Sequence, residues 1–325
     1  MLKYKVILTT FYIFFGALNY AQVIDNTASF KNNNSDKYVR LQYDNDFFTA
    51  IDEYYTQGIS FEWAHPALKK NPLNNLLIQP RNSDMKYGLR LDHFGYTPSS
   101  ISSDFIRYGD RPFCGNLSFS TFLIAIDTIK QSRLSSSLTL GVIGSKAGGR
   151  EMQVAIHRWL KNITPVGWQY QIANDVIVNY QIQYEKALWH YRDVFLVNSN
   201  SELRGGTHTN KIKTGINFML GSLNNPYLSH IKAQSSKKTW RYYLYGQVQP
   251  GFTIYDATLQ GGLFNKKSPY TIATKDLTRL TCQADFGLVA NFGKLTLEYT
   301  QSLITKEFKT GHLHRWGGVR IGAVF

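Results

Sequence analysis

The residues most suggestive of chemistry are Gln153 and His157, which are four positions apart. Residues at i and i+4 of a helix lie on the same face, so these two side chains would be neighbours. A histidine beside an amide could hold a water molecule and remove its proton, as general-base hydrolysis requires. The competing interpretation is a histidine that only packs or hydrogen-bonds within the protein.

A second candidate cluster consists of Asn45, Asp46 and Thr56. Asn45 and Asp46 directly follow one predicted strand and Thr56 begins the next, so a hairpin would bring the three side chains close together. Amide, carboxylate and hydroxyl oxygens, together with loop carbonyls, suit a hard cation such as Ca²⁺. Asparagine and aspartate are also favoured in turns, so ordinary turn formation is the alternative.

Other well-known catalytic patterns do not occur in the sequence. It contains no Gly-x-Ser-x-Gly elbow and no His-Glu-x-x-His motif, and the glycines of residues 144–149 do not follow the phosphate-loop pattern. Serine-triad and zinc mechanisms therefore have no support.

The elements that must position these residues are strands, because apolar and polar residues alternate along most of the chain. About twelve segments show this pattern: 38–43, 58–64, 86–94, 116–127, 136–144, 175–186, 193–204, 211–221, 240–252, 278–291, 294–304 and 314–325. Charged residues opposite an apolar stripe suit a barrel with a polar interior and a lipid-facing exterior. We therefore predict an all-β fold, a closed antiparallel transmembrane β-barrel.

One break interrupts the strands over residues 148–162. Four apolar residues recur there at helical spacing: Met152, Ala155, Ile156 and Trp159. The pattern predicts a short amphipathic helix that starts at the Gly148-Gly149 pair and is ended by Pro165. If the N-terminus is periplasmic, the connections after odd-numbered strands are extracellular. The helix, the Asn45-Asp46 turn and the segment Asp110-Arg111-Pro112 then all lie on the outer side.

Composition also favours a barrel over a soluble β-sandwich. Aromatic residues make up 14% of the chain, whereas charged residues make up 18%, compared with about 25% in soluble domains. Lipid-facing apolar side chains and aromatic girdles at the membrane interfaces explain both values.

The first residues have the order of a secretory signal peptide, with Lys3 and Lys5 before an apolar run over 6–18 and a cleavage region at 19–22. We expect residues 1–21 to be removed and 22–325 to form one barrel domain in the bacterial outer membrane. No later segment approaches the roughly 20 consecutive apolar residues of a spanning helix.

The chain is basic, with a formal net charge of +14 at pH 7. An exported barrel does not meet nucleic acid, so we expect no such partner. The polyanion available at the outer membrane is the sugar-phosphate face of lipopolysaccharide. The charge fits equally well a set of basic loops that have no specific ligand.

The two cysteines, Cys114 and Cys282, are far apart in the sequence and match no metal-binding spacing. We expect no disulfide between them. Cys282 belongs to an alternating segment and is expected to face lipid.

Several segments occur in an order that is specific, although each is weakly specific alone. They are Tyr43-Asp44-Asn45-Asp46-Phe47-Phe48, Asp52-Glu53-Tyr54-Tyr55-Thr56-Gln57-Gly58, Asp110-Arg111-Pro112-Phe113-Cys114-Gly115, Leu140-Gly141-Val142-Ile143-Gly144 leading to Gly149, Gln153, His157 and Gly167-Trp168, and Phe308-Lys309-Thr310-Gly311. Together they resemble the outer-membrane lipid A 3-O-deacylase family, LpxR, over almost the whole mature chain.

The resemblance implies a twelve-stranded barrel whose active site lies between the wall and a helix in an extracellular loop. It also implies chemistry similar to that of phospholipase A2, in which a histidine activates water and Ca²⁺ takes up the oxyanion charge. By matching position, His157 would be the base, Asn45 and Asp46 would shape the cation and oxyanion site, and Thr56 and Gln153 would complete the pocket.

Two positions depart from the family pattern. Gln57 stands where many members have asparagine. Ile163 stands six positions after the histidine, where some members carry an acidic residue, so the role of that acid would be lost or filled elsewhere, for example by Asp175.

We therefore expect a monomeric, Ca²⁺-dependent hydrolase that removes an ester-linked acyl chain from lipid A. The alternatives are an outer-membrane phospholipase and a pore or scaffold barrel without catalysis. A pore would conduct ions, whereas a barrel with a packed lumen would not. Five charged residues are expected to point inward and would allow ion pairs to plug the lumen: Arg40, Glu62, Arg90, Glu185 and Glu298.

Overall fold

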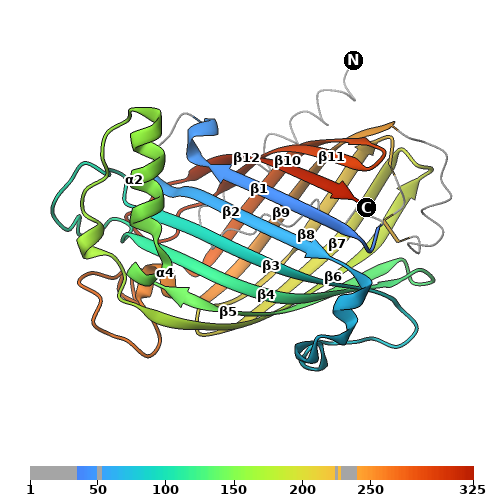
Figure 1. Ribbon diagram of the computed structural model, residues 1–325, viewed down its shortest axis with the longest axis horizontal. Coiled ribbons are helices and arrows are strands. Elements are labelled where there is room, and N and C mark those ends of the chain that lie inside the picture. The colour runs from blue at the N-terminus through green and yellow to red at the C-terminus, as the bar shows by residue number, and fades with distance from the viewer. Residues whose placement is uncertain (1–34, 50–52, 224–225, 228–239) are drawn as a thin grey trace, which may run out of the picture.

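The computed structural model describes residues 35–49, 53–223, 226–227 and 240–325, and the expected signal peptide lies outside this range. Within the described part, twelve strands close into one antiparallel barrel, which confirms the predicted fold (Figure 1). The strands are β1 (Tyr38–Asn45), β2 (Tyr54–Ala64), β3 (Asp84–Thr97), β4 (Cys114–Asp127), β5 (Ser132–Ile143), β6 (Asp175–Tyr191), β7 (Phe195–Gly206), β8 (Thr209–Gly221), β9 (Trp240–Asp256), β10 (Leu280–Phe292), β11 (Leu295–Ile304) and β12 (His314–Val324).

Two helices lie in the connections of the described chain. The predicted helix corresponds to α2 (Gly149–Leu160), between β5 and β6, and a second helix, α4 (Ala257–Gln260), follows β9. Short 3-10 turns are η2 (Asp46–Thr49), η3 (Pro66–Lys70), η4 (Pro72–Leu76), η5 (Ser145–Ala147) and η6 (Trp168–Tyr170). Across the described residues, neither helix has the length and apolar character needed to cross a membrane.

The barrel closes by pairing of its first and last strands, with Tyr38 opposite Val324 and Asn45 opposite Gly317. Because all neighbours are antiparallel, connections after odd-numbered strands share one end of the barrel and those after even-numbered strands share the other. Figure 1 shows α2 and α4 at one end, opposite the connection that contains η3 and η4. The Asn45-Asp46 turn after β1 and the helix α2 after β5 therefore lie at the same end of the barrel, as predicted.

Alternation sorts the side chains of each strand between lipid and lumen. In β1, Leu41 is 50% exposed, whereas its neighbours Arg40 and Gln42 are 1% and 3% exposed. The outer surface is consequently apolar and the inner surface polar, which is the arrangement that a transmembrane barrel requires.

Ion pairs fill the lumen and confirm the inward direction of the predicted charges. The buried pairs include Arg40–Glu62, Arg133–Glu185 and Arg320–Glu298. Arg90 pairs with Asp92 at 2.8 Å. Because removal of one partner from a buried pair costs about 3–5 kcal/mol, these contacts hold the lumen in one arrangement.

The packed lumen predicts that the protein does not conduct ions. Side chains along a water-filled channel are exposed to water, but Lys211 is 0% exposed and Lys213 and Gln249 are each 1% exposed. We expect the purified protein to give no conductance steps in planar bilayers in which a general porin, used as control, does. Regular channel openings would contradict the packed lumen and favour the pore alternative.

Both cysteines are free thiols, which confirms that they form no disulfide. Cys282 alternates with the buried Thr281 and Gln283 and so faces outward as predicted, while Cys114 is fully buried. Neither cysteine therefore crosslinks the barrel.

Candidate active site

A β-bulge in β2 places Thr56 on the outer surface of the barrel. The register against β3 shifts at Thr56, after which Gln57 pairs with Gly95. A Cβ atom added at Gly95 would lie 3.4 Å from Cγ2 of Thr56 and 3.3 Å from Cγ of Gln57, so both side chains lie over this glycine. Gly95 is on the same face of β3 as Leu91, which is 48% exposed toward lipid. Thr56 therefore belongs to the outer wall.

Helix α2 lies against this outer wall because two glycines allow a close approach. A Cβ atom added at Gly115 of β4 would lie 3.1 Å from the backbone nitrogen of Gly149, and one added at Gly149 would lie 2.9 Å from Cα of Gly115. Just before the helix, Nε2 of His93 donates a hydrogen bond to the carbonyl oxygen of Ala147 at 2.8 Å. These contacts fix the N-terminal end of α2 on β3 and β4.

Gln153 joins the helix to the wall with one end of its side-chain amide and to the turn η6 with the other. Its Nε2 donates to Oγ1 of Thr56 at 3.1 Å, and its Oε1 accepts from Nε1 of Trp168 at 2.8 Å. The indole nitrogen can only donate, so it determines which end of the amide is the oxygen. The predicted proximity of Gln153 and Thr56 is thus confirmed, and Gln153 positions the helix face that also carries His157.

His157 lies one turn further along α2 and is 7% exposed. Its Nδ1 is 2.7 Å from the carbonyl oxygen of Ile163. A carbonyl oxygen can only accept, so Nδ1 carries a proton, and in the neutral ring Nε2 has the lone pair. This is the tautomer that a general base needs, because Nε2 can accept a proton from water.

The end of α2 brings the Ile163 carbonyl to the histidine. Lys161 adopts a left-handed conformation with φ of 54°, and the N–H of Asn162 donates to the carbonyl oxygen of His157 at 2.9 Å. This is a Schellman-type turn, which reverses the chain within two residues. The helix therefore ends at Leu160, and the prediction that Pro165 ends it is wrong.

Ile163, which stands where some family members have an acidic residue, contacts His157 through its backbone. The backbone carbonyl of this residue orients the His157 ring, and a carbonyl is present whatever the side chain at that position. The suggested substitute, Asp175, plays a different part, because its carboxylate accepts hydrogen bonds from the N–H groups of Val176, Phe264 and Asn265. Asp175 thus anchors the connection after β9.

Asn45 lies on the strand next to Thr56. Asp44 of β1 pairs with Gly58 of β2, so Asn45 lies one step further along, beside Gln57. Facing residues on paired strands have Cβ atoms roughly 5 Å apart. Asn45 is therefore part of the same patch of outer wall as the Thr56–Gln153 contact.

The side chains of Asn45 and Asp46 make the contacts of a turn. Oδ1 of Asn45 accepts from the N–H of Phe47 at 2.7 Å, and Oδ2 of Asp46 accepts from the N–H of Glu53 at 2.6 Å. Asp46 is also 1% exposed. Turn formation is thus confirmed for both residues. Amide and carboxylate oxygens are also the type of ligand that a hard cation takes.

The donor set at this turn fits a hard cation. Asn45, Asp46 and Thr56 offer only oxygen ligands, the type that Ca²⁺ prefers. Among the described residues, no group of three or more His, Cys, Asp or Glu side chains could hold a metal. A cation here would therefore depend on amide, hydroxyl, backbone and water oxygens besides the Asp46 carboxylate.

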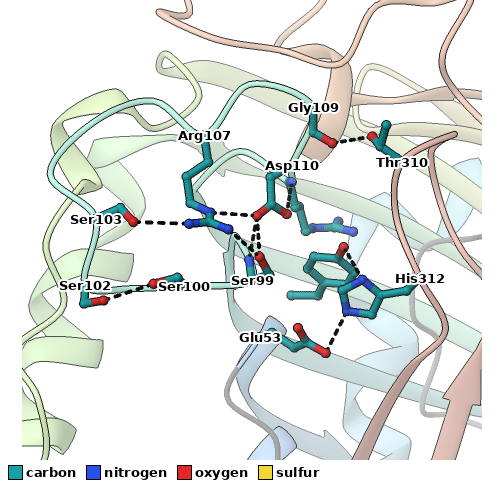
Figure 2. A network of polar contacts seen from close by, with 12 residues as sticks. Glu53, Ser99, Ser100, Ser102, Ser103, Arg107, Gly109, Asp110, Thr310 and His312 are labelled. Atoms are coloured by element: carbon teal, nitrogen blue, oxygen red, sulfur yellow. Dashed lines mark hydrogen bonds and ion pairs between the residues drawn. The ribbon is translucent and has the colours of Figure 1, made fainter.

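Two other family segments hold the connections at this end of the barrel together. Buried Arg111 pairs with Glu307 and donates through Nη2 to Oγ1 of Thr258 at 2.8 Å. Burial raises the pKa of the Glu307 carboxyl to about 7, and the Arg111 guanidinium opposes this rise. The Thr310 hydroxyl donates to the Gly109 carbonyl oxygen (Figure 2). These segments stabilise the loops around the site.

The structure therefore joins Thr56 and Gln153 directly, carries His157 on the same helix face, and places Asn45 and Asp46 at the end of the adjacent strand. Two groups that hold the site residues in place were not predicted from the sequence, the Trp168 indole and the Ile163 backbone carbonyl. Trp168 belongs to a family segment and could have been noticed there, whereas a backbone carbonyl such as that of residue 163 leaves no pattern in the residue types.

Comparisons with known proteins agree with this architecture. A family model described as outer membrane protein LpxR matches residues 7–325. A search of curated proteins found no match. LpxR from Salmonella typhimurium superposes with a TM-score of 0.70 at 19% identity, covering 89% of this chain and 100% of that chain.

Other bacterial barrels superpose less well. The β domain of the Bordetella autotransporter Brka gives a TM-score of 0.45 at 7% identity, over 89% of this chain and 97% of that chain. The NalP translocator domain from Neisseria meningitidis gives 0.41 at 9% identity, over 90% and 89%. Because the family model spans nearly the entire chain, the protein belongs to the LpxR family of outer-membrane proteins.

Proposed function

We propose that this protein hydrolyses an ester-linked acyl chain of lipid A in the outer leaflet of the outer membrane. The observation that carries the proposal is the hydrogen bond between Nδ1 of His157 and the Ile163 carbonyl. It leaves Nε2 as a proton acceptor on a helix held against the lipid-facing wall. A base at that place can meet an ester that arrives by lateral diffusion in the membrane.

In the proposed reaction, Nε2 of His157 accepts a proton from water while the water oxygen attacks the ester carbonyl carbon. The electron pair of the carbonyl double bond moves to its oxygen and forms a tetrahedral oxyanion. Collapse of this intermediate breaks the bond to the sugar oxygen, which takes the proton back from the imidazolium. The products are a fatty acid and a lipid with a free hydroxyl group. Gln153 and Thr56 act as positioning residues.

Asn45 and Asp46 are the residues that would hold Ca²⁺. When bound, the ion would supply positive charge beside the developing oxyanion, which is worth several kcal/mol of transition-state stabilisation. The oxygen-only donor set supports this assignment. The resemblance to the lipid A deacylase segments supports the choice of substrate.

Mass spectrometry of lipid A tests the proposed activity. We expect cells that make the protein to contain lipid A that is lighter by one acyl chain, and cells that make the His157→Ala variant to contain unmodified lipid A. Release of fatty acid from phospholipid with unchanged lipid A would instead assign a phospholipase. Unchanged lipids in both classes would remove the hydrolase proposal.

The close contact between Gly115 and Gly149 predicts a mutant with a folded but inactive barrel. Gly115→Val would push α2 away from the wall, and a displacement of about 1 Å can lower a rate roughly 100-fold. The measurement compares the hydrolysis rate with the heat-modifiable migration of the folded barrel. Gly322→Ala is the control, because a Cβ atom added there meets nothing closer than 3.8 Å. Equal rates in both variants would show that the close approach is not needed.

Strand parity predicts that the candidate site faces the outside of the cell. An epitope inserted at Lys146, just before α2, should be accessible to antibody on intact cells. One inserted between Asn71 and Asp84, at the other end of the barrel, should require permeabilised cells. The reverse pattern would place the site in the periplasm, where phospholipid is the available substrate.

A further inference from the structure

A pocket of about 420 Å³ opens between connections at the same end of the barrel as α2. Its walls come from the start of β2, the connection between β3 and β4, and the connection between β11 and β12. The lining includes Tyr54, Phe105, Arg107, Tyr108, Asp110 and His312. Its volume lies in the range of about 300–1,000 Å³ that is usual for small-molecule sites.

The polar wall of the pocket has a fixed geometry. Nε of Arg107 donates to Oδ2 of Asp110 at 3.0 Å, and Nη2 donates to Oγ of Ser99 at 3.1 Å (Figure 2). Nη1 lies 3.4 Å from Oγ of Ser103. A guanidinium has five N–H groups, so one on each terminal nitrogen is still available to a ligand. Arg107 is therefore a rigid, preformed two-point donor.

Two exposed aromatic rings form the apolar wall of the pocket. Tyr108 is 79% exposed and Phe105 is 61% exposed. Tyr108 is supported from behind by an edge-to-face contact with Tyr270, whose ring centroid is 5.5 Å away. The Tyr270 hydroxyl in turn accepts from the N–H of Gly109 at 2.8 Å. Both exposed rings line the pocket, so they present an apolar surface to whatever occupies it.

One wall of the pocket is linked to the Asp46 turn through His312 and Glu53. His312 bridges the Tyr54 hydroxyl, at 3.1 Å from Nδ1, and the Glu53 carboxylate, at 2.8 Å from Nε2. The backbone N–H of Glu53 donates to Asp46. Tyr54 has a φ of +60°, a left-handed conformation that a bulky residue rarely adopts and that stores backbone strain. Tyr55 separates Tyr54 from Thr56, whose hydroxyl accepts from Gln153 of α2.

We propose that this pocket binds a saccharide and takes the sugar head group of the lipid whose acyl chain is cleaved beside α2. The assignment to the lipid rests on the proposed function. A sugar offers apolar C–H faces to the rings of Phe105 and Tyr108, and hydroxyl groups to the polar wall. An anionic substituent on the sugar pairs with the two free N–H groups of Arg107. An acyl chain would use neither Arg107 nor His312.

Direct binding tests the pocket without any hydrolysis. The inactive His157→Ala protein in detergent micelles is titrated with a soluble phosphorylated glucosamine disaccharide that carries no acyl chain, and heat is measured by calorimetry. We expect saturable binding, about fivefold weaker when Tyr108→Ala is added, because a stacking contact is worth about 1 kcal/mol. Tyr108→Phe keeps the ring and should bind normally. Phe264→Ala is the matched control, because Phe264 is an exposed aromatic outside the pocket, in a connection at the same end.

Kinetics with the intact lipid identify the source of the sugar. In the otherwise unchanged enzyme, Tyr108→Ala should raise KM more than it lowers kcat, whereas Phe264→Ala should change neither. No disaccharide binding, or equal binding by the Tyr108→Ala and Tyr108→Phe proteins, would overturn the proposal. Binding of the free disaccharide with an unchanged KM would overturn the assignment to the lipid head group. If the disaccharide binds but the unaltered protein cleaves no lipid A, the saccharide site stands and the proposed function is wrong.

Discussion

Replacement of His157 by alanine is expected to lower the rate of acyl ester hydrolysis by about 10²–10⁴-fold, the contribution of a positioned general base. The barrel should still fold, because His157 lies on a connection and takes no part in strand pairing. The rate is measured by mass spectrometry of purified lipid A in detergent micelles, and folding by heat-modifiable migration.

Glu151→Ala is the matched control, because Glu151 is on the same helix but is exposed. This variant should hydrolyse lipid A at the rate of the unchanged protein. A His157→Ala protein that retains full activity would remove the general-base assignment. A loss of activity in the Glu151→Ala protein as well would show that α2 is sensitive to any change.

Removal of divalent cations with EGTA is expected to stop hydrolysis, and Ca²⁺ but not Zn²⁺ is expected to restore it. Oxygen ligands favour the harder ion. Only one carboxylate, that of Asp46, is assigned to the proposed site, so we expect half-maximal recovery at about 10⁻⁴–10⁻³ M Ca²⁺, the range of weak extracellular sites. Full activity in excess EGTA would contradict a role for the cation.

Asp46→Ala tests the same site from the protein side and should reduce the rate by about 10²–10³-fold, as expected for loss of oxyanion stabilisation. Asp127→Ala is the control for an aspartate that stabilises a turn and lies outside the candidate site. The Asp127 carboxylate also accepts backbone N–H groups of a turn, those of Ile129 and Lys130, at the other end of the barrel. Equal effects of the two substitutions on rate and folding yield would show that Asp46 only shapes its turn.

The strands could be predicted because lipid and lumen impose opposite requirements on successive residues. Where that contrast weakens, the prediction fails. Alternation places the start of the second strand at Gly58, but β2 begins at Tyr54, and the bulge at Thr56 breaks the pattern between them. Side chains from Tyr54 to Gly58 are all buried, so their polarity does not report which face they occupy.

The site could be predicted only in part. Helical spacing was enough to put Gln153 and His157 on one face, because that relation is local. The partners of these residues are not local: Thr56 belongs to a strand far away in the sequence, and Trp168 lies beyond the helix end. The carbonyl that orients His157 belongs to the backbone, which every residue shares, so residue type contains no information about it.

The seam between β1 and β12 supports the turn that carries Asn45 and Asp46. The 3-10 turn after Asn45 rests on the last strand: a Cβ atom added at Gly317 would lie 2.5 Å from Cβ of Phe48, and the Thr49 hydroxyl donates to the Arg315 carbonyl at 3.1 Å. These contacts exist only where the first and last strands are paired. An open sheet of the same twelve strands would therefore leave the turn that carries Asn45 and Asp46 without this support.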